Sequence, residues 1–299
     1  MDQEQTPHKR RVRYKGKYPR KFEEKYKELQ PEKYGDTIAH VIRKGNTPAG
    51  MHISIMVKEI LEFLKIQPGE TGFDATLGYG GHTKAMLEQL QGRGHIYATD
   101  VDPEESAKTK KRLAEAGYGE EILTIKLQNF CTIDEIAKEV GGFDFILADL
   151  GVSSMQIDNP SRGFSFKVDG PLDLRLNQQQ GISAAERLDT ISREELAGML
   201  YENSDEPYCE ELAKAITDEI RKGHRIDTTT KLREVIEKTL DFLPEKEKKD
   251  TIKKTCQRTF QALRIDVNRE FEVLYEFMEK LPGALKPGGR VAILTFHSG

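Results

Sequence analysis

Short apolar segments and amphipathic segments alternate between residues 51 and 149. The apolar segments predict four buried strands, at Gly72–Thr76, His95–Thr99, Ile122–Leu127 and Phe143–Leu147. Apolar residues at helical spacing predict helices at Ser54–Lys65, Lys84–Leu90, Pro103–Ala116 and Ile133–Val140. Strands and helices that follow one another with short connections are typical of a parallel sheet covered by helices. The pattern therefore predicts an α/β fold for this part of the chain.

A different pattern covers residues 159–254, where no segment has the character of a strand. Amphipathic spacing predicts helices there, at Ala184–Leu188, Glu194–Leu200, Cys209–Arg221 and Thr230–Leu240, before a charged run at Pro244–Lys254. Ser192 and Glu195 have the spacing of a capping box. The α/β pattern then returns with a helix at Asn268–Leu281, a turn at Leu285–Arg290 and a strand at Val291–Phe296. We therefore predict a helical insertion at 159–254 in an α/β domain formed by residues 51–158 and 255–299.

Positive charge is concentrated at the beginning of the chain. Residues 1–50 carry 13 Lys+Arg and 7 Asp+Glu, a local net charge of +6, whereas the whole chain has a net charge of -4. Tyr14 and Tyr18 lie among eight basic residues between His8 and Lys21. This composition suits a flexible basic extension that contacts the phosphates and bases of RNA or DNA, and it equally suits a solvated tail.

Several classes of protein do not fit the composition. No segment has the roughly 18–20 consecutive apolar residues of a membrane-spanning helix, and the first residues lack the apolar core of a secretory signal. The three cysteines, Cys131, Cys209 and Cys256, are far apart, so the sequence supports neither a disulfide framework nor a structural zinc site. We expect a cytoplasmic protein that contains no metal and does not enter a membrane.

Polar or glycine-rich residues follow all four predicted strands. They are the loop Leu77–Thr83, Asp100, the segment Gln128–Phe130 and Asp149. The carboxyl ends of parallel strands lie at one edge of a sheet, which is where such sheets bind their ligands. The sequence therefore predicts a ligand site at this edge.

Each of these residues also has a purely structural explanation. The loop Leu77–Thr83 either lets the backbone approach a ligand or makes a tight turn, and its order G-Y-G-G-H is not the G-x-G-x-x-G of dinucleotide-binding loops. Asp100 either accepts hydrogen bonds from a ribose or caps the next helix, a role that Asp102 fits better. Phe130 either packs on an adenine or closes the core, and Asp149 either contacts an amine or cofactor or stabilises a turn.

Longer blocks of sequence resemble a known family. They are DATLGYGGHT (Asp74–Thr83), DVDP (Asp100–Pro103), DLGVSSMQIDNPSRGFSFKVDGPLDLRL (Asp149–Leu176), RTFQALRIDVN (Arg258–Asn268) and PGGRVAILTFHS (Pro287–Ser298). These blocks resemble the bacterial MraW/RsmH family of S-adenosylmethionine-dependent methyltransferases, which act on N4 of a cytidine in the decoding region of 16S ribosomal RNA. The resemblance covers residues 51–299. It implies a class I methyltransferase fold with a helical insertion that helps to recognise substrate.

The resemblance also implies roles for individual residues. The family's cofactor contacts correspond to Gly80, Gly81, His82, Asp100, Phe130, Asp149 and Gln156. We expect Asp149 to be the catalytic residue and His297 to line the pocket. The candidates for RNA contact are Arg162, Arg175, Arg258 and Arg264, although the two arginines of RTFQALR equally suit salt bridges. The implied partner is 16S ribosomal RNA or the small ribosomal subunit, and the sequence leaves open whether the protein is a monomer or a homodimer.

Several positions depart from the family pattern. Tyr79 replaces the usual Arg, Thr83 replaces Ser, and Thr255-Cys256-Gln257 replaces Pro-Ala-Thr, which suggests a divergent branch. The family continues beyond FHS, so we expect the last strands of the sheet to be missing from this chain. The alternatives are an impaired RNA-binding remnant, a methyltransferase that acts on another nucleic acid or a small molecule, and a nicotinamide-dependent oxidoreductase. The order of the glycines disfavours the oxidoreductase.

Overall fold

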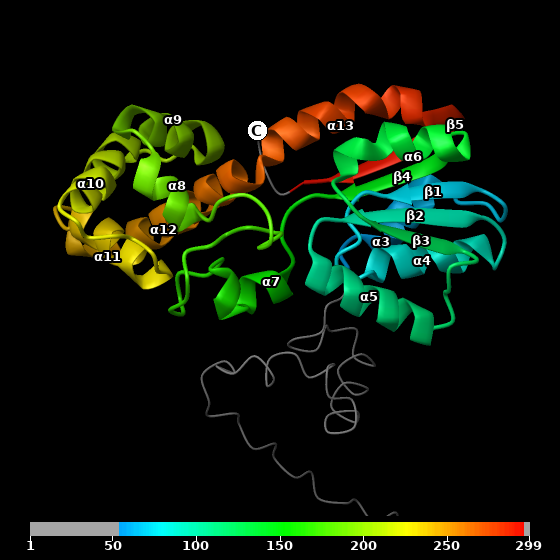
Figure 1. Ribbon diagram of the computed structural model, residues 1–299, viewed down its shortest axis with the longest axis horizontal. Coiled ribbons are helices and arrows are strands. Elements are labelled where there is room, and N and C mark those ends of the chain that lie inside the picture. The colour runs from blue at the N-terminus through cyan, green and yellow to red at the C-terminus, as the bar shows by residue number, and fades with distance from the viewer. Residues whose placement is uncertain (1–53, 296–299) are drawn as a thin grey trace, which may run out of the picture. The chain divides into compact units, whose positions relative to one another are not determined.

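The computed structural model describes residues 54–295 and contains a five-stranded, fully parallel sheet (Figure 1). Its strands are β1 (Thr71–Asp74), β2 (His95–Asp100), β3 (Leu123–Leu127), β4 (Phe143–Asp149) and β5 (Leu285–Leu294). They lie in the order β3-β2-β1-β4-β5, so the direction of the chain across the sheet reverses between β1 and β4. The predicted α/β fold is confirmed. The basic extension at 1–50 and His297 lie outside the described residues.

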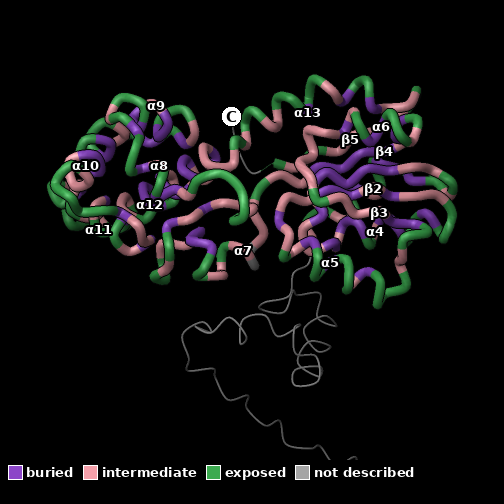
Figure 2. Tube along the Cα trace, in the orientation of Figure 1, coloured by how far each residue is buried: buried purple, intermediate pink, exposed green. Residues whose placement is uncertain are grey.

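Helices cover both faces of this sheet. One core cluster joins the sheet to α3 (Val57–Leu64), α4 (Gly81–Leu90) and α5 (Pro103–Glu115), and a second joins it to α6 (Ile133–Val140) and α13 (Glu270–Ala284). Successive residues of β4 belong to opposite clusters, because side chains alternate along a strand: Phe145 and Leu147 lie in the first, Ile146 and Ala148 in the second. Figure 2 shows the resulting band of buried residues along the central strands.

A separate group of helices follows the sheet's fourth strand. It begins with α7 (Ser154–Asp158) and a 3-10 turn, η3 (Pro160–Arg162), and continues with α8 (Ala184–Thr190), α9 (Arg193–Ser204), α10 (Cys209–Arg221), α11 (Thr229–Thr239) and α12 (Glu245–Asn268). Leucines and isoleucines of α8–α12, such as Leu200, Ile216 and Leu263, share one apolar core. The helices predicted from apolar spacing are therefore present, and they form a core of their own.

The long helix α12 crosses the boundary that the sequence pattern placed between residues 254 and 255. It is continuous for 24 residues, and Cys256, Phe260 and Leu263 pack in the core of the helical group. The charged run at 244–254 forms the first turns of this helix and not a separate segment. Residues 255–263 thus belong by packing to the helical group, although we assigned them to the α/β domain.

Two local predictions differ from the structure in detail. The turn at Leu285–Arg290 lies inside β5, where Leu285 pairs with Phe143 and Arg290 with Phe145, so the extra residues form a bulge. The capping box at Ser192 forms only in part, because the Ser192 side chain accepts from Glu195 N while the Glu195 carboxylate contacts Arg187.

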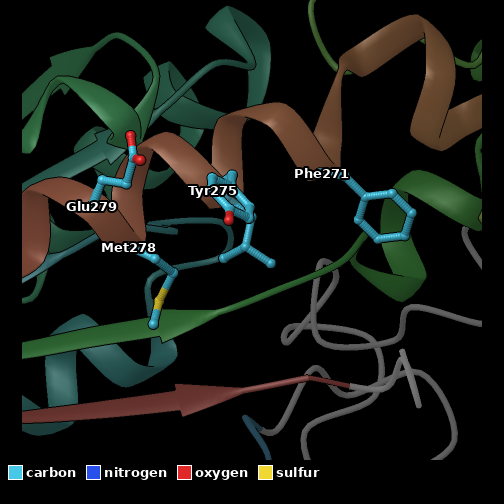
Figure 3. A pocket seen from close by; sticks show the side chains of 5 residues that line it. Phe271, Tyr275, Met278 and Glu279 are labelled. Carbon is cyan, nitrogen blue, oxygen red and sulfur yellow. The ribbon is translucent and has the colours of Figure 1, made fainter.

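The surface of α13 carries an apolar hollow of about 520 Å³ (Figure 3). Phe271, Tyr275 and Met278 line it together with Leu274 and Glu279, and Tyr275 is 74% exposed. None of the residues that follow β1, β2 or β4 lines this hollow. The hollow is therefore not the ligand site that the sequence predicts. No helix among the described residues is long and apolar enough to cross a membrane.

Candidate active site

Hydrogen bonds join the glycine loop to the ends of two strands. Gly78 N donates to Asp100 Oδ2 at the end of β2, at 2.8 Å. Thr76 Oγ1 accepts from Asp149 N at the end of β4, also at 2.8 Å. The loop that follows β1 is thus connected to both of its neighbours, and the predicted convergence at this edge of the sheet is present.

Helix α5 supports the glycine loop from outside. Thr109 Oγ1 donates to Gly78 O at 2.6 Å, and Arg112 Nη2 donates to Tyr79 O at 3.2 Å. The Arg112 guanidinium also lies 3.6 Å from the centre of the Tyr79 ring, a cation–π contact. Tyr79, which departs from the family pattern, therefore has a partner 33 residues further along the chain that the sequence pattern did not reveal.

Gly80 occupies a position that only glycine fits without strain. Its φ is 82°, and an added Cβ would lie 2.7 Å from Thr109 Cγ2 and 3.2 Å from Leu113 Cδ1. We expect Gly80→Ala to displace the loop and weaken cofactor binding about tenfold or more, since a loss of about 1.4 kcal/mol of binding free energy is a factor of ten. Calorimetric titration with S-adenosylmethionine measures the change.

Gly92→Ala is the matched control for this variant. Gly92 has a similar φ of 72°, but no atom lies within 4 Å of the position of its added Cβ. Both variants introduce the left-handed strain of a non-glycine residue, about 1–2 kcal/mol, and only Gly80→Ala introduces the clash. Equal cofactor affinities in the two variants would contradict the proposed role of the glycine loop in cofactor binding.

Asp100 is a half-buried carboxylate with a raised pKa. Its Oδ2 accepts from Gly78 N and its Oδ1 from Asp102 N, and burial raises its pKa to about 6 despite these hydrogen bonds. Asp102 is the residue that caps α5, since its Oδ1 accepts from Glu104 N and Glu105 N. A carboxylate has about four acceptor positions, so Asp100 retains capacity for hydroxyl donors. A ribose diol fits this site.

His82 lies between α3 and the end of β4. Its ring is buried, with Nε2 2.8 Å from Ile55 O and Nδ1 3.6 Å from Asp149 Oδ2. The Asp149 side chain is 27% exposed, so it is open to a ligand on the side away from its protein contacts. The protein neighbours of His82 therefore place it beside Asp149.

A fully buried acid supports the other side of the loop. Asp74 accepts hydrogen bonds from Thr83 Oγ1 at 2.5 Å and from Thr76 N at 3.0 Å. Burial raises the pKa of Asp74, and the two hydrogen bonds oppose that rise. The Thr83 hydroxyl thus fixes the buried acid at the start of α4. The sequence pattern missed Asp74, although an acid at the end of an apolar strand was a visible signal.

Phe130 and Gln156 have partners that the sequence did not indicate. Phe130 begins the 3-10 turn η2 (Phe130–Thr132) and packs edge-on against Phe277, with ring centres 5.1 Å apart. Phe130 therefore closes the core, and its half-buried ring keeps an open part. The Gln156 side chain completes a capping box with Ser153 and donates from Nε2 to Asp102 Oδ2 at 3.1 Å.

The four candidate arginines are engaged within the protein to different degrees. Arg162 is only 3% exposed and is paired with Asp102, so its geometry does not fit the expected RNA contact. Arg175 pairs with Asp173, and Arg264 makes two hydrogen bonds to Glu270. The Arg258 side chain is 38% exposed and 4.0 Å from Glu206. Of the two arginines of RTFQALR, Arg264 is thus held in a salt bridge, whereas Arg258 keeps an exposed side chain.

Among residues 54–295, no group of three His, Cys, Asp or Glu side chains has the arrangement of a metal site. The residues at the strand ends offer instead a glycine loop and two carboxylates, Asp100 and the partly exposed Asp149. These groups suit a ligand that carries hydroxyl and amine donors.

Comparisons with known proteins identify the family of this chain. A model of the "MraW methylase family" matches residues 49–299. "Ribosomal RNA small subunit methyltransferase H 1" of Agathobacter rectalis is 86% identical over 296 residues, 99% of this chain and 85% of that protein. Its namesake in Lachnoclostridium phytofermentans is 69% identical over 298 residues, 100% of this chain and 81% of that protein. The chain thus belongs to the MraW methylase family, and S-adenosylmethionine is its cofactor.

Proposed function

We propose that this protein methylates N4 of a cytidine in the decoding region of 16S ribosomal RNA, in the cytoplasm. The names of the relatives support a ribosomal RNA substrate. The position of Asp149 carries the proposal: its backbone is anchored by Thr76, and its partly exposed carboxylate lies beside the glycine loop. An amine donor is the partner that such a carboxylate suits.

The chemistry requires an activated amine. The exocyclic amine of cytosine is a weak nucleophile, because its lone pair is delocalised into the ring. In our proposal the Asp149 carboxylate accepts a hydrogen bond from this amine, which increases electron density on the nitrogen, and holds the proton that the amine loses. Gly151 has a φ of 126° and no atom within 4 Å of an added Cβ, so the backbone two residues after Asp149 is open on that side.

The remaining strand-end residues hold the cofactor in this proposal. Bound S-adenosylmethionine supplies a methyl group activated by a sulfonium centre. Asp100 accepts hydrogen bonds from the ribose hydroxyls, and Gly80 and Gly81 let the backbone approach the ligand at the start of α4. The open part of the Phe130 ring packs against the adenine. Gln156 and His82 act through Asp102 and Asp149, their neighbours in the structure.

The RNA has to present an unstacked base to the strand ends. The Arg258 side chain is 38% exposed, more than those of the other three arginines. We therefore propose it as an RNA contact on α12. We propose the same role for the basic extension at 1–50, which lies outside the described residues.

A methylation assay tests the function directly. The protein is incubated with labelled S-adenosylmethionine and small ribosomal subunits, free 16S RNA or DNA, and the digested nucleic acid is analysed by mass spectrometry. We expect N4-methylcytidine, with the label absent from DNA. A methyl group on another atom contradicts the proposal, and cofactor binding without transfer to either RNA favours a non-catalytic RNA-binding protein.

A further inference from the structure

Arg162 is a buried cation that contacts two distant parts of the chain. Its Nη2 donates to Asp102 Oδ2, and its Nη1 donates to Leu176 O at 2.9 Å. A guanidinium stays charged in proteins, so its burial requires a carboxylate and further acceptors. Asp102, which is itself 1% exposed, supplies that carboxylate.

On one side of Arg162, the contacts lead to the cofactor site. Asp102 Oδ2 accepts from both Arg162 and Gln156 Nε2, while Asp102 N donates to Asp100 Oδ1 at 2.9 Å. The orientation of the Asp100 carboxylate thus depends on the Asp102 backbone, and Arg162 and Gln156 both anchor the Asp102 side chain. Gln156 also caps α7, the first element after Asp149.

On the other side, the contacts lead to the helical group. Leu176 N donates to Asn268 Oδ1 at 2.8 Å, and Asn268 Nδ2 donates to Leu174 O at 2.7 Å and to Arg264 O at 2.8 Å. Asn268 is the last residue of α12. A continuous set of hydrogen bonds therefore runs from Asp100 to α12, and Arg162 is the side chain that joins its two halves.

We propose that Arg162 is a positioning residue for the cofactor. Arg162 holds Asp102, and through it Asp100, in place. Its contact with Leu176, which in turn contacts Asn268, connects this arrangement to α12. The proposal rests on the proposed binding of the cofactor at Asp100. It assigns to Arg162 a role inside the protein in place of the RNA contact that the sequence suggested. Because linkage is reciprocal, a ligand that displaces the end of α12 also changes cofactor affinity.

The test is calorimetric titration of S-adenosylmethionine into Arg162→Met, which needs no RNA. We expect the Kd to rise about tenfold, within the usual range for coupled sites, and Arg162→Lys to recover part of the loss. In steady-state assays the KM for S-adenosylmethionine rises more than kcat falls. Asn268→Ala, which leaves the Arg162–Asp102 pair intact, raises the Kd by a smaller factor, and its effect is not additive with that of Arg162→Met.

Two reference variants separate the possible outcomes. Arg225→Met breaks the ion pair of Arg225 with Asp189, which involves no residue of α12, and is expected to leave the Kd unchanged. Asp100→Ala with unchanged affinity overturns the proposed cofactor site and this inference with it. If Asp100→Ala weakens binding while folded Arg162→Met binds like the wild type, only the inference on Arg162 is overturned. If Arg162→Met does not fold, Arg162→Lys and Asn268→Ala decide, and wild-type affinity in both overturns it.

Discussion

Asp149→Asn is expected to lower kcat by about 10²–10⁴-fold, the usual contribution of a positioned acid–base group. The substitution keeps the size of the side chain but removes the negative charge that polarises the substrate amine and receives its proton. The Asp149 backbone contact to Thr76 remains, so the end of β4 is expected to keep its structure. Single-turnover methylation with saturating cofactor measures the chemical step, and calorimetry checks that cofactor still binds.

Asp144→Asn is the matched control for this prediction. Asp144 lies on the same strand at its opposite end, where it accepts hydrogen bonds from Thr71 N and Lys286 Nζ. Its replacement is expected to reduce stability but to leave the single-turnover rate close to that of the wild type. A loss of less than tenfold in Asp149→Asn, with cofactor binding intact, contradicts the proposed role of Asp149.

Asp100→Ala is expected to weaken cofactor binding by about 10–100-fold, since hydrogen bonds to a charged group contribute about 1.5–3 kcal/mol each. The wild type should show a matching dependence on pH. Burial raises the pKa of Asp100 from 3.8 to about 6, and the ionised form is the one that accepts ribose hydroxyls. Affinity is therefore full about one pH unit above this pKa, is roughly halved at pH 6 and decreases further as the pH falls.

Titration with S-adenosylmethionine between pH 5 and pH 7.5 distinguishes the ionisation of Asp100 from other effects of pH on cofactor affinity. Asp100→Asn keeps the shape of the side chain but cannot ionise, so its affinity should be low and nearly independent of pH across the range. The wild type and Asp100→Asn should become more similar at the acidic end. A flat wild-type profile contradicts the assignment of Asp100, whatever the absolute affinities are.

Much of the sheet could be predicted from the sequence. The bounds of α6 and α10 agree with the apolar spacing, and β4 ends at the predicted Asp149, because glycines and acids interrupt the apolar segments there. The start of α12 could not be predicted in this way. Its first turns are strongly charged, and the sequence gives no sign that they continue into the apolar turn around Phe260. The bulge in β5 depends on pairing with β4, which local sequence does not encode.

The candidate site was predicted less evenly. Asp100 and Asp149 could be placed at one edge of the sheet, because the ends of parallel strands converge whatever their side chains contact. The partners of the arginines could not be predicted in this way. Arg162 pairs with Asp102 across 60 residues of sequence, and an arginine in a motif looks the same whether it is buried or exposed. The same holds for His82, whose ring meets a carbonyl 27 residues earlier.

The continuity of α12 has a consequence for chimaeric proteins. A graft that exchanges residues 159–254 between two relatives cuts this helix in its middle and divides the apolar core, since Phe260 and Leu263 lie beyond the cut. The transplanted helices then have to pack against residues that evolved with other neighbours. A graft that ends after Asn268 transfers the whole helix together with its contacts to Leu174 and Leu176. The unit of exchange in this fold is thus 159–268.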